Sequence, residues 1–168
     1  MPSNDFDLIF AELEHAAVRY LVVGGVAVVL HGHARFTADL DLVIALDPAN
    51  VHAAMAALGR LEYRPRAPVS AEQFADPIAR EQWVREKGLT VYSLWSPSHP
   101  ATEVDIFVEE PFPFDEAFSR AARADLGEIQ VTVASVDDLI KLKRAAGRPK
   151  DEEDIRALEA LIRERADG

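Results

Sequence analysis

The sequence of 168 residues predicts an α/β (α+β) fold in which helices flank a mixed β-sheet. Short apolar runs rich in β-branched residues alternate with segments of helical period, which indicates strands and helices in turn. Two of these runs, 89–95 and 103–108, are too close together for a crossover helix, so they should pair antiparallel. Hydrophobic residues make up 49% of the chain and charged residues 28%, the balance of a globular domain.

In the first half of the chain, helices and strands alternate. An amphipathic helix is expected near the N-terminus, followed by a buried strand that ends at Gly24-Gly25. A short helix then ends at Gly32. After a second strand, Asp47 and Pro48 begin another helix as the N-cap and first-turn residues.

The second half contains more loop signals. Residues 62–77 hold three prolines and predict a loop or short insertion. Ser135 and Asp138 have the spacing of a capping box that opens a helix. The predicted helices are 3–18, 26–31, 47–58, 78–87, 114–124, 135–146 and 150–166, and the predicted strands are 20–23, 40–44, 89–95, 103–108 and 129–133. We expect one domain, with a core over 1–134 and a C-terminal helical hairpin over 135–168 packed on it.

Composition excludes several classes of protein. Cysteine is absent, which excludes disulfides, thiolate zinc sites and cysteine nucleophiles. The longest apolar run, 20–30, is too short to span a bilayer, and no basic segment of a signal peptide opens the sequence. We therefore expect a cytoplasmic protein that does not associate with a membrane.

The charge pattern opposes a long nucleic-acid partner. The chain has 18 basic and 29 acidic residues, a net charge of −11, which repels a polyphosphate backbone unless basic residues cluster. Residues 141–150 contain five Lys/Arg, and the acidic run 151–154 follows at once. Such a pattern alone indicates two solvated helix faces.

The first candidate site is the pair Asp39 and Asp41 at the start of the strand 40–44. Residues two apart in a strand face the same way, about 6.6 Å apart along the chain. Two carboxylates held so close repel each other and raise each other's pKa. A divalent cation relieves that repulsion, and oxygen-only ligands suit Mg²⁺.

The second candidate is Gly24-Gly25, between a buried strand and a helix. This position leaves backbone N–H groups free at the end of the strand, where a phosphate can bind. A tight strand-to-helix turn explains the pair equally well. The pattern is neither a dinucleotide fingerprint nor a P-loop, because the further glycines and the Gly-Lys-Ser/Thr triplet are missing.

Taken together, these motifs resemble the DNA polymerase beta-like nucleotidyltransferase superfamily. The signature of this superfamily is similar to the string Val23-Gly24-Gly25, a spacer of thirteen residues and then Asp39-Leu40-Asp41-Leu42. Its third carboxylate is matched by Asp105, which lies between apolar residues. The chain also resembles a bacterial subgroup that includes the abortive-infection toxin nucleotidyltransferases. The resemblance lies in the string from Gly24 to Asp41 and in the ending Lys141…Gly147-Arg148-x-x-Asp151-x-x-Asp154. Many members have Ser where this chain has Gly25, and the hydroxyl of that serine would contact the nucleotide phosphate.

The resemblance implies a nucleotidyltransferase fold and a site for an NTP with two Mg²⁺ ions, for which Mn²⁺ could substitute. Asp39 and Asp41 would bridge both ions, and Asp105 would hold the ion that activates the acceptor hydroxyl. The implied nucleotide-binding residues are Gly24, Gly25, Arg35, Thr37, Lys141 and Lys143. Lys141 and Lys143 lie on opposite sides of a helix, so at most one of them should face the site.

Three functions remain open from the sequence. The first is a metal-dependent transfer of NMP from an NTP to a hydroxyl of a tRNA end or protein, in a toxin–antitoxin system with a small partner protein. The second is modification of a small molecule by the same chemistry. The third is a catalytically silent module that binds a nucleotide or a partner. The presence of all three carboxylates favours an enzyme.

Overall fold

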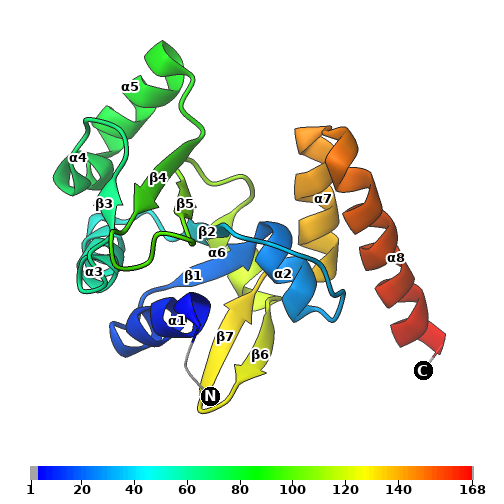
Figure 1. Ribbon diagram of the computed structural model, residues 1–168. Helices are drawn as coiled ribbons and strands as arrows, with labels where there is room; N and C mark the ends of the chain where they lie inside the picture. The colour runs from blue at the N-terminus through cyan, green and yellow to red at the C-terminus, as the bar shows by residue number, and fades with distance from the viewer. Residues whose placement is uncertain (1–3, 168) are drawn as a thin grey trace.

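The computed structural model describes residues 4–167 as a mixed seven-stranded sheet with helices on both faces (Figure 1). The strands are β1 (Tyr20–Val23), β2 (Leu40–Ile44), β3 (Arg64–Pro65), β4 (Val91–Trp95), β5 (Val104–Phe107), β6 (Ala122–Leu126) and β7 (Ile129–Val133). The helices are α1 (Asp5–His15), α2 (Gly24–Leu30), α3 (Pro48–Gly59), α4 (Ala71–Ala75), α5 (Pro77–Lys87), α6 (Phe114–Ser119), α7 (Val136–Ala146) and α8 (Glu152–Asp167), with a 3₁₀ turn η1 (Pro149–Asp151) before α8. The predicted fold class is confirmed.

The strand order is β3-β4-β5-β2-β1-β7-β6. β1 runs antiparallel to β2 and parallel to β7, and β2 runs parallel to β5. β4 pairs antiparallel with β5, as the short connection between them predicts. Two segments that are far apart in the sequence, β2 and β5, therefore lie side by side at the centre of the sheet.

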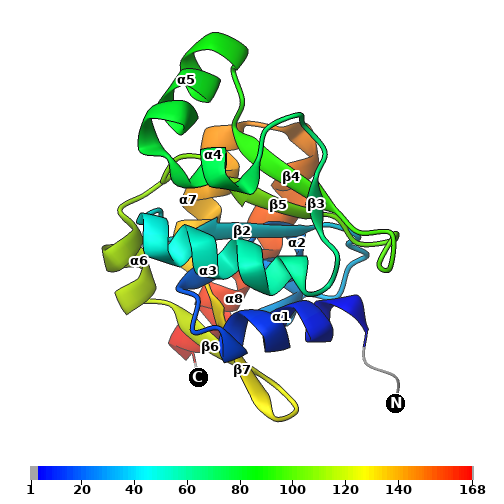
Figure 2. The same ribbon diagram turned by 90° about the vertical axis from the view of Figure 1, so that its left-hand side faces the viewer.

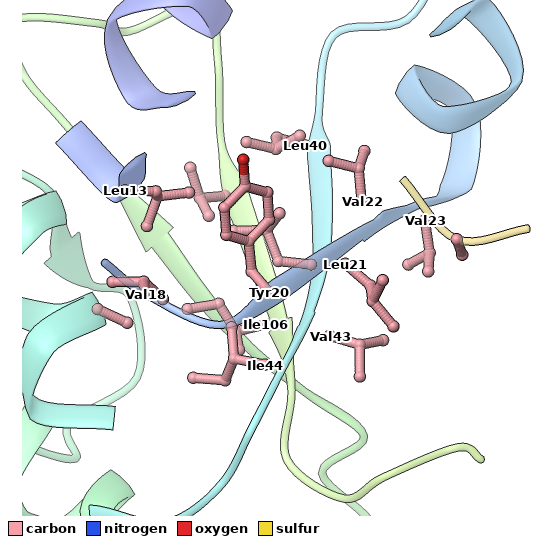
Figure 3. Packing of buried hydrophobic residues seen from close by; sticks show 14 of the residues in the cluster. Leu13, Val18, Tyr20, Leu21, Val22, Val23, Leu40, Val43, Ile44 and Ile106 are labelled. Atoms are coloured by element: carbon pink, nitrogen blue, oxygen red, sulfur yellow. The ribbon is translucent and has the colours of Figure 1, made fainter. Parts of the chain in front are cut away.

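Central strands are buried on both faces, which their apolar sequences explain. All four residues of β1 are buried, and their side chains point to alternate sides of the strand (Figure 3). α1 and α3 cover one face of the sheet and stand in front of it in Figure 2. α7 and α8 stand side by side on the opposite face (Figure 1). Burial on both faces accounts for the near-continuous apolar runs of the sequence.

Local signals set most helix ends. Asp47 accepts a hydrogen bond from the backbone N–H of Asn50, which caps α3 as predicted. Gly88 ends α5 in the left-handed conformation, with φ of 60°. α1 is shorter than the predicted helix 3–18, because the chain turns at Ala17, which has φ of 54°. Residue 3 of that prediction lies outside the described residues.

Of three other expectations, the loop or short insertion over 62–77 is met in part, and two helix boundaries are wrong. The segment 62–77 is not only a loop, since it contains β3 and the capped helix α4. The helix expected over 114–124 ends at Ser119, and 122–126 forms strand β6 in a hairpin with β7. The helix expected from residue 26 begins two residues earlier, so Gly24 and Gly25 are the first residues of α2.

The chain turns sharply between α7 and α8. Gly147 has φ of 63°, the left-handed conformation that ends α7, and η1 then leads into α8. The two helices contact each other, and α7 also contacts α2. The division of the chain into a core over 1–134 and a hairpin over 135–168 stays a prediction. No helix within residues 4–167 is long and apolar enough to cross a membrane.

Candidate active site

The register of two parallel strands brings the predicted carboxylates together. Asp41 of β2 pairs directly with Asp105 of β5. Paired residues on neighbouring strands point to the same face, and the strands lie about 4.8 Å apart. Asp39 lies just before β2 and shares the parity of Asp41. The alternate residues Leu40 and Leu42 are fully buried, as predicted.

Burial and mutual repulsion perturb these acids. Burial raises the pKa of Asp41 to about 6, and the charges of Asp105 and Asp39 add to the effect, while Lys143 and Arg148 oppose it. Burial also raises the pKa of Asp105, although the Ser93 hydroxyl acts in the opposite direction and lowers this pKa. Asp105 Oδ1 is buried and has no hydrogen-bond partner among the residues that the structure describes. A cation would satisfy this oxygen and relieve the repulsion.

The two glycines leave room for the acids and their neighbours. A Cβ at Gly24, which has φ of 70°, would lie 2.2 Å from Oδ2 of Asp41. A Cβ at Gly25 would lie 2.8 Å from Oγ1 of Thr37. The Thr37 hydroxyl therefore occupies the space that a side chain at position 25 would need, which accounts for glycine at this position.

A polar cavity of about 420 Å³ opens over these residues. Its walls come from the start of α2, the segment before β2, the carboxylates and the turn after α7. The cavity is lined by Gly24, Gly25, Arg35, Phe36, Thr37, Ala38, Asp39, Asp41, Asp105, Lys143, Arg148, Lys150 and Asp151. Eight of the nine residues predicted for the site line this one cavity.

Lys141 is the exception. It is exposed and lines a different cavity, with Asp137 and Asp138, on another side of α7. The structure therefore does not place Lys141 in the predicted nucleotide site, because the helical period turns it away from the carboxylates when Lys143 faces them. The structure agrees with the expectation that at most one of the two lysines faces the site.

Two buried acids hold three of the four cations that line the polar cavity. Lys143 is 7% exposed, and its Nζ lies 3.0 Å from Asp154 and 3.5 Å from Asp151. Asp154 also forms an ion pair with Arg35, and Asp151 accepts a 2.8 Å hydrogen bond from Nε of Arg148. The network joins the segment before β2 to α7, η1 and α8. It keeps three positive side chains beside three carboxylates.

The interpretation of 141–154 as two solvated helix faces is thus only partly right. Lys141, Glu152 and Glu153 are exposed, whereas Asp151 and Asp154 are each only 3% exposed. The number of charged residues in 141–154 does not distinguish the exposed charges from the buried ones. A usable signal was their spacing of three, which places both on one side of a helical turn.

A metal site would need more than the protein supplies. Within residues 4–167, no three Asp, Glu or His side chains converge closely enough to form a metal cage by themselves. Mg²⁺ commonly binds through one or two carboxylates plus substrate phosphates and water. The carboxylates and the orphan oxygen of Asp105 fit that mode of binding.

This fold and this carboxylate site define a nucleotidyltransferase. A family model described as nucleotidyl transferase AbiEii toxin, type IV toxin–antitoxin system, matches residues 7–158. The chain belongs to this family, which confirms the resemblance found in the sequence. A search of curated protein sequences finds no match.

Solved structures share the fold over nearly the whole chain. The lincosamide antibiotic adenylyltransferase LnuA, solved with lincomycin, is 15% identical with a TM-score of 0.62, covering 93% of this chain and 95% of its own. ANT(2")-Ia, solved with adenylyl-2"-tobramycin, is 15% identical with a TM-score of 0.59, covering 96% and 92%. A nucleotidyltransferase-like protein from Paracoccidioides brasiliensis is 17% identical with a TM-score of 0.56, covering 96% and 78%. At these identities the comparisons establish the fold.

The buried ion pairs predict unequal effects on stability for the two lysines of α7. Lys143→Ala should lower the free energy of unfolding by about 3 kcal/mol, because it leaves two buried carboxylates without their shared cation. The matched change Lys141→Ala should alter it by less than about 0.5 kcal/mol, since an exposed charge contributes little. Urea denaturation of both variants measures the difference. Equal stabilities would mean that the Lys143 network is not formed in solution.

The close approach of Gly24 to Asp41 predicts a loss of ligand binding without a matching loss of stability. Gly24→Ala and Gly88→Ala both place alanine at a positive φ, which costs each about 1 kcal/mol. Only the first brings a Cβ onto a carboxylate, since nothing lies within 4 Å at Gly88. Gly24→Ala should therefore lose Mg²⁺–NTP binding by calorimetry, while Gly88→Ala keeps it. Normal binding by Gly24→Ala would contradict the described position of Asp41.

Proposed function

We propose that the protein transfers NMP from an NTP to an acceptor hydroxyl with the help of two Mg²⁺ ions. The observation that supports this most is the pairing of Asp41 with Asp105, which leaves a buried carboxylate oxygen without a hydrogen bond beside two further carboxylate side chains. Folding alone gains nothing from that arrangement, since it raises the pKa values of both acids.

The polar cavity fits the triphosphate. Gly24 and Gly25 let phosphate oxygens approach the backbone, and Arg35, Arg148 and Lys150 line the same cavity. Lys143 lines the cavity together with the carboxylates and is held by Asp151 and Asp154. These cations would neutralise the pyrophosphate as it leaves.

Asp39 and Asp41 would hold both ions, and Asp105 would hold only the ion on the acceptor side. When bound, Mg²⁺ lowers the pKa of a coordinated hydroxyl and neutralises charge on the phosphates. Asp105 would accept the acceptor's proton as the general base. The acceptor oxygen then forms a bond to the α-phosphorus, the α–β phosphoanhydride bond breaks, and pyrophosphate leaves in line with the attack.

The acceptor is a hydroxyl of a tRNA end, a protein or a small molecule. The family description places its toxins in type IV toxin–antitoxin systems, which supports a small antitoxin protein as the counterpart of this chain. The antibiotic adenylyltransferases of similar fold support a small-molecule acceptor, because they match nearly the full length of the chain.

Calorimetry with each NTP tests the proposal. The wild type should bind an NTP with Mg²⁺ or Mn²⁺ and bind it at least tenfold more weakly in EDTA, because the carboxylates repel the bare triphosphate. Asp39→Asn should weaken the Mg²⁺-dependent binding tenfold or more.

Asp137→Asn, at an exposed acid of α7 outside the polar cavity, is the control and should bind normally. Equal affinity of the wild type in Mg²⁺ and in EDTA would rule out a metal-bridged nucleotide.

A further inference from the structure

A second cavity, of about 510 Å³, adjoins the polar cavity and is mostly apolar. On the sheet side it is lined by Val91 of β4 and Phe107 of β5, and on the helix side by Leu139 and Leu142 of α7. Asp41 and Asp105 line both this cavity and the polar one. The carboxylates thus stand at the junction of a polar cavity and an apolar cavity.

In-line transfer assigns different roles to the two cavities. The attacking oxygen and the leaving pyrophosphate lie on opposite sides of the α-phosphorus. If the pyrophosphate lies in the polar cavity, over Gly24 and Gly25, the acceptor hydroxyl must come from the opposite side. Asp41 and Asp105 line the apolar cavity, whereas Asp39 and the cations Arg35 and Lys150 line only the polar one, so the acceptor side is assigned to the apolar cavity.

The charges in the apolar cavity do not suit a polynucleotide. Its lining cations are Lys143 and Arg148, which it shares with the polar cavity and which the proposed function assigns to the triphosphate, so its lining offers no further cation to a nucleic-acid backbone. A nucleic-acid end needs cations that exchange for its counterions, and the net charge of −11 opposes its approach. A volume of this size with mainly apolar walls is typical of small-molecule sites.

We propose that the apolar cavity holds the acceptor, and that the acceptor is a small uncharged molecule with an apolar body and a hydroxyl group. The inference rests on the proposed function and narrows its acceptor to one class. The apolar body would lie between β4, β5 and α7, and its hydroxyl would point to Asp105.

Substitutions that fill the apolar cavity from opposite walls test whether the acceptor binds there. Ala146 of α7 and Thr90 before β4 are both exposed and line the cavity, so Ala146→Phe and Thr90→Phe can fill it without disturbing the core. The control is Ala56→Phe, at an exposed position of α3 on the other face of the sheet. The probe is 2-naphthol, an uncharged apolar alcohol, titrated by fluorescence in saturating Mg²⁺–NTP.

The wild type and the control should bind 2-naphthol, and each filled variant should bind it at least tenfold more weakly while its NTP affinity changes less than twofold. Unchanged naphthol binding in both filled variants would overturn the proposal. A tenfold loss of NTP affinity would also overturn it, because the cavity would then hold the nucleoside. A wild type that binds no NTP would instead refute the proposed function.

Labelling of a fractionated extract tests the class of acceptor. Bacterial extract is separated into RNA, protein and solvent-extractable small molecules, and each pool is incubated with the protein, Mg²⁺ and α-labelled NTP. Label should enter the small-molecule pool, and Ala146→Phe should reduce this labelling tenfold or more relative to Ala56→Phe. Label confined to RNA or protein would overturn the proposal.

Discussion

The site depends on one pairing, that of β2 with β5 in parallel register. It places Asp41 beside Asp105 on a half-buried face, next to Asp39, where burial and then the charges of these two acids raise the pKa of Asp41 to about 6. The fold tolerates this repulsion because the alternate residues of both strands, such as Leu42 and Ile106, are buried in the core. A shift of the register by one residue would turn the acids into that core, so the same packing that stabilises the sheet fixes the site.

The C-terminal helices supply the opposite charge. Asp151 and Asp154 hold Lys143, Arg35 and Arg148 around the polar cavity, so its cations are in position before a ligand arrives. The same helices form one wall of the apolar cavity through Leu139 and Leu142. A core of strands alone would therefore carry the acids without the groups that hold a triphosphate or an acceptor.

Local signals made much of this structure predictable. The strands 20–23, 40–44 and 129–133 are found as predicted, because β-branched apolar runs bounded by turn residues are strong strand signals. Strand β6 was missed because its sequence, Ala-Arg-Ala-Asp-Leu, has little strand propensity and pairs only through the hairpin with β7. The spacing of the acids and glycines indicated the carboxylate site. The spacing of Asp151 and Asp154 indicates that they share one side of a helical turn, but their burial could not be predicted, since it arises from tertiary contacts between distant segments.

The central claim is that the fold holds repelling carboxylates for a cation, and melting curves of the wild type and of Asp105→Asn from pH 4 to 8 test it most directly. A folded pKa raised above 3.8 contributes stability at low pH that is lost as the pH rises through about 6, where Asp41 ionises. In EDTA, Asp105→Asn should therefore melt like the wild type near pH 4 and several degrees higher at pH 7.5, and Mg²⁺–NTP should stabilise the wild type more than the variant. A variant that is less stable than the wild type at pH 7.5 in EDTA, and gains as much from Mg²⁺–NTP, would show that Asp105 is a structural partner and contradict the account.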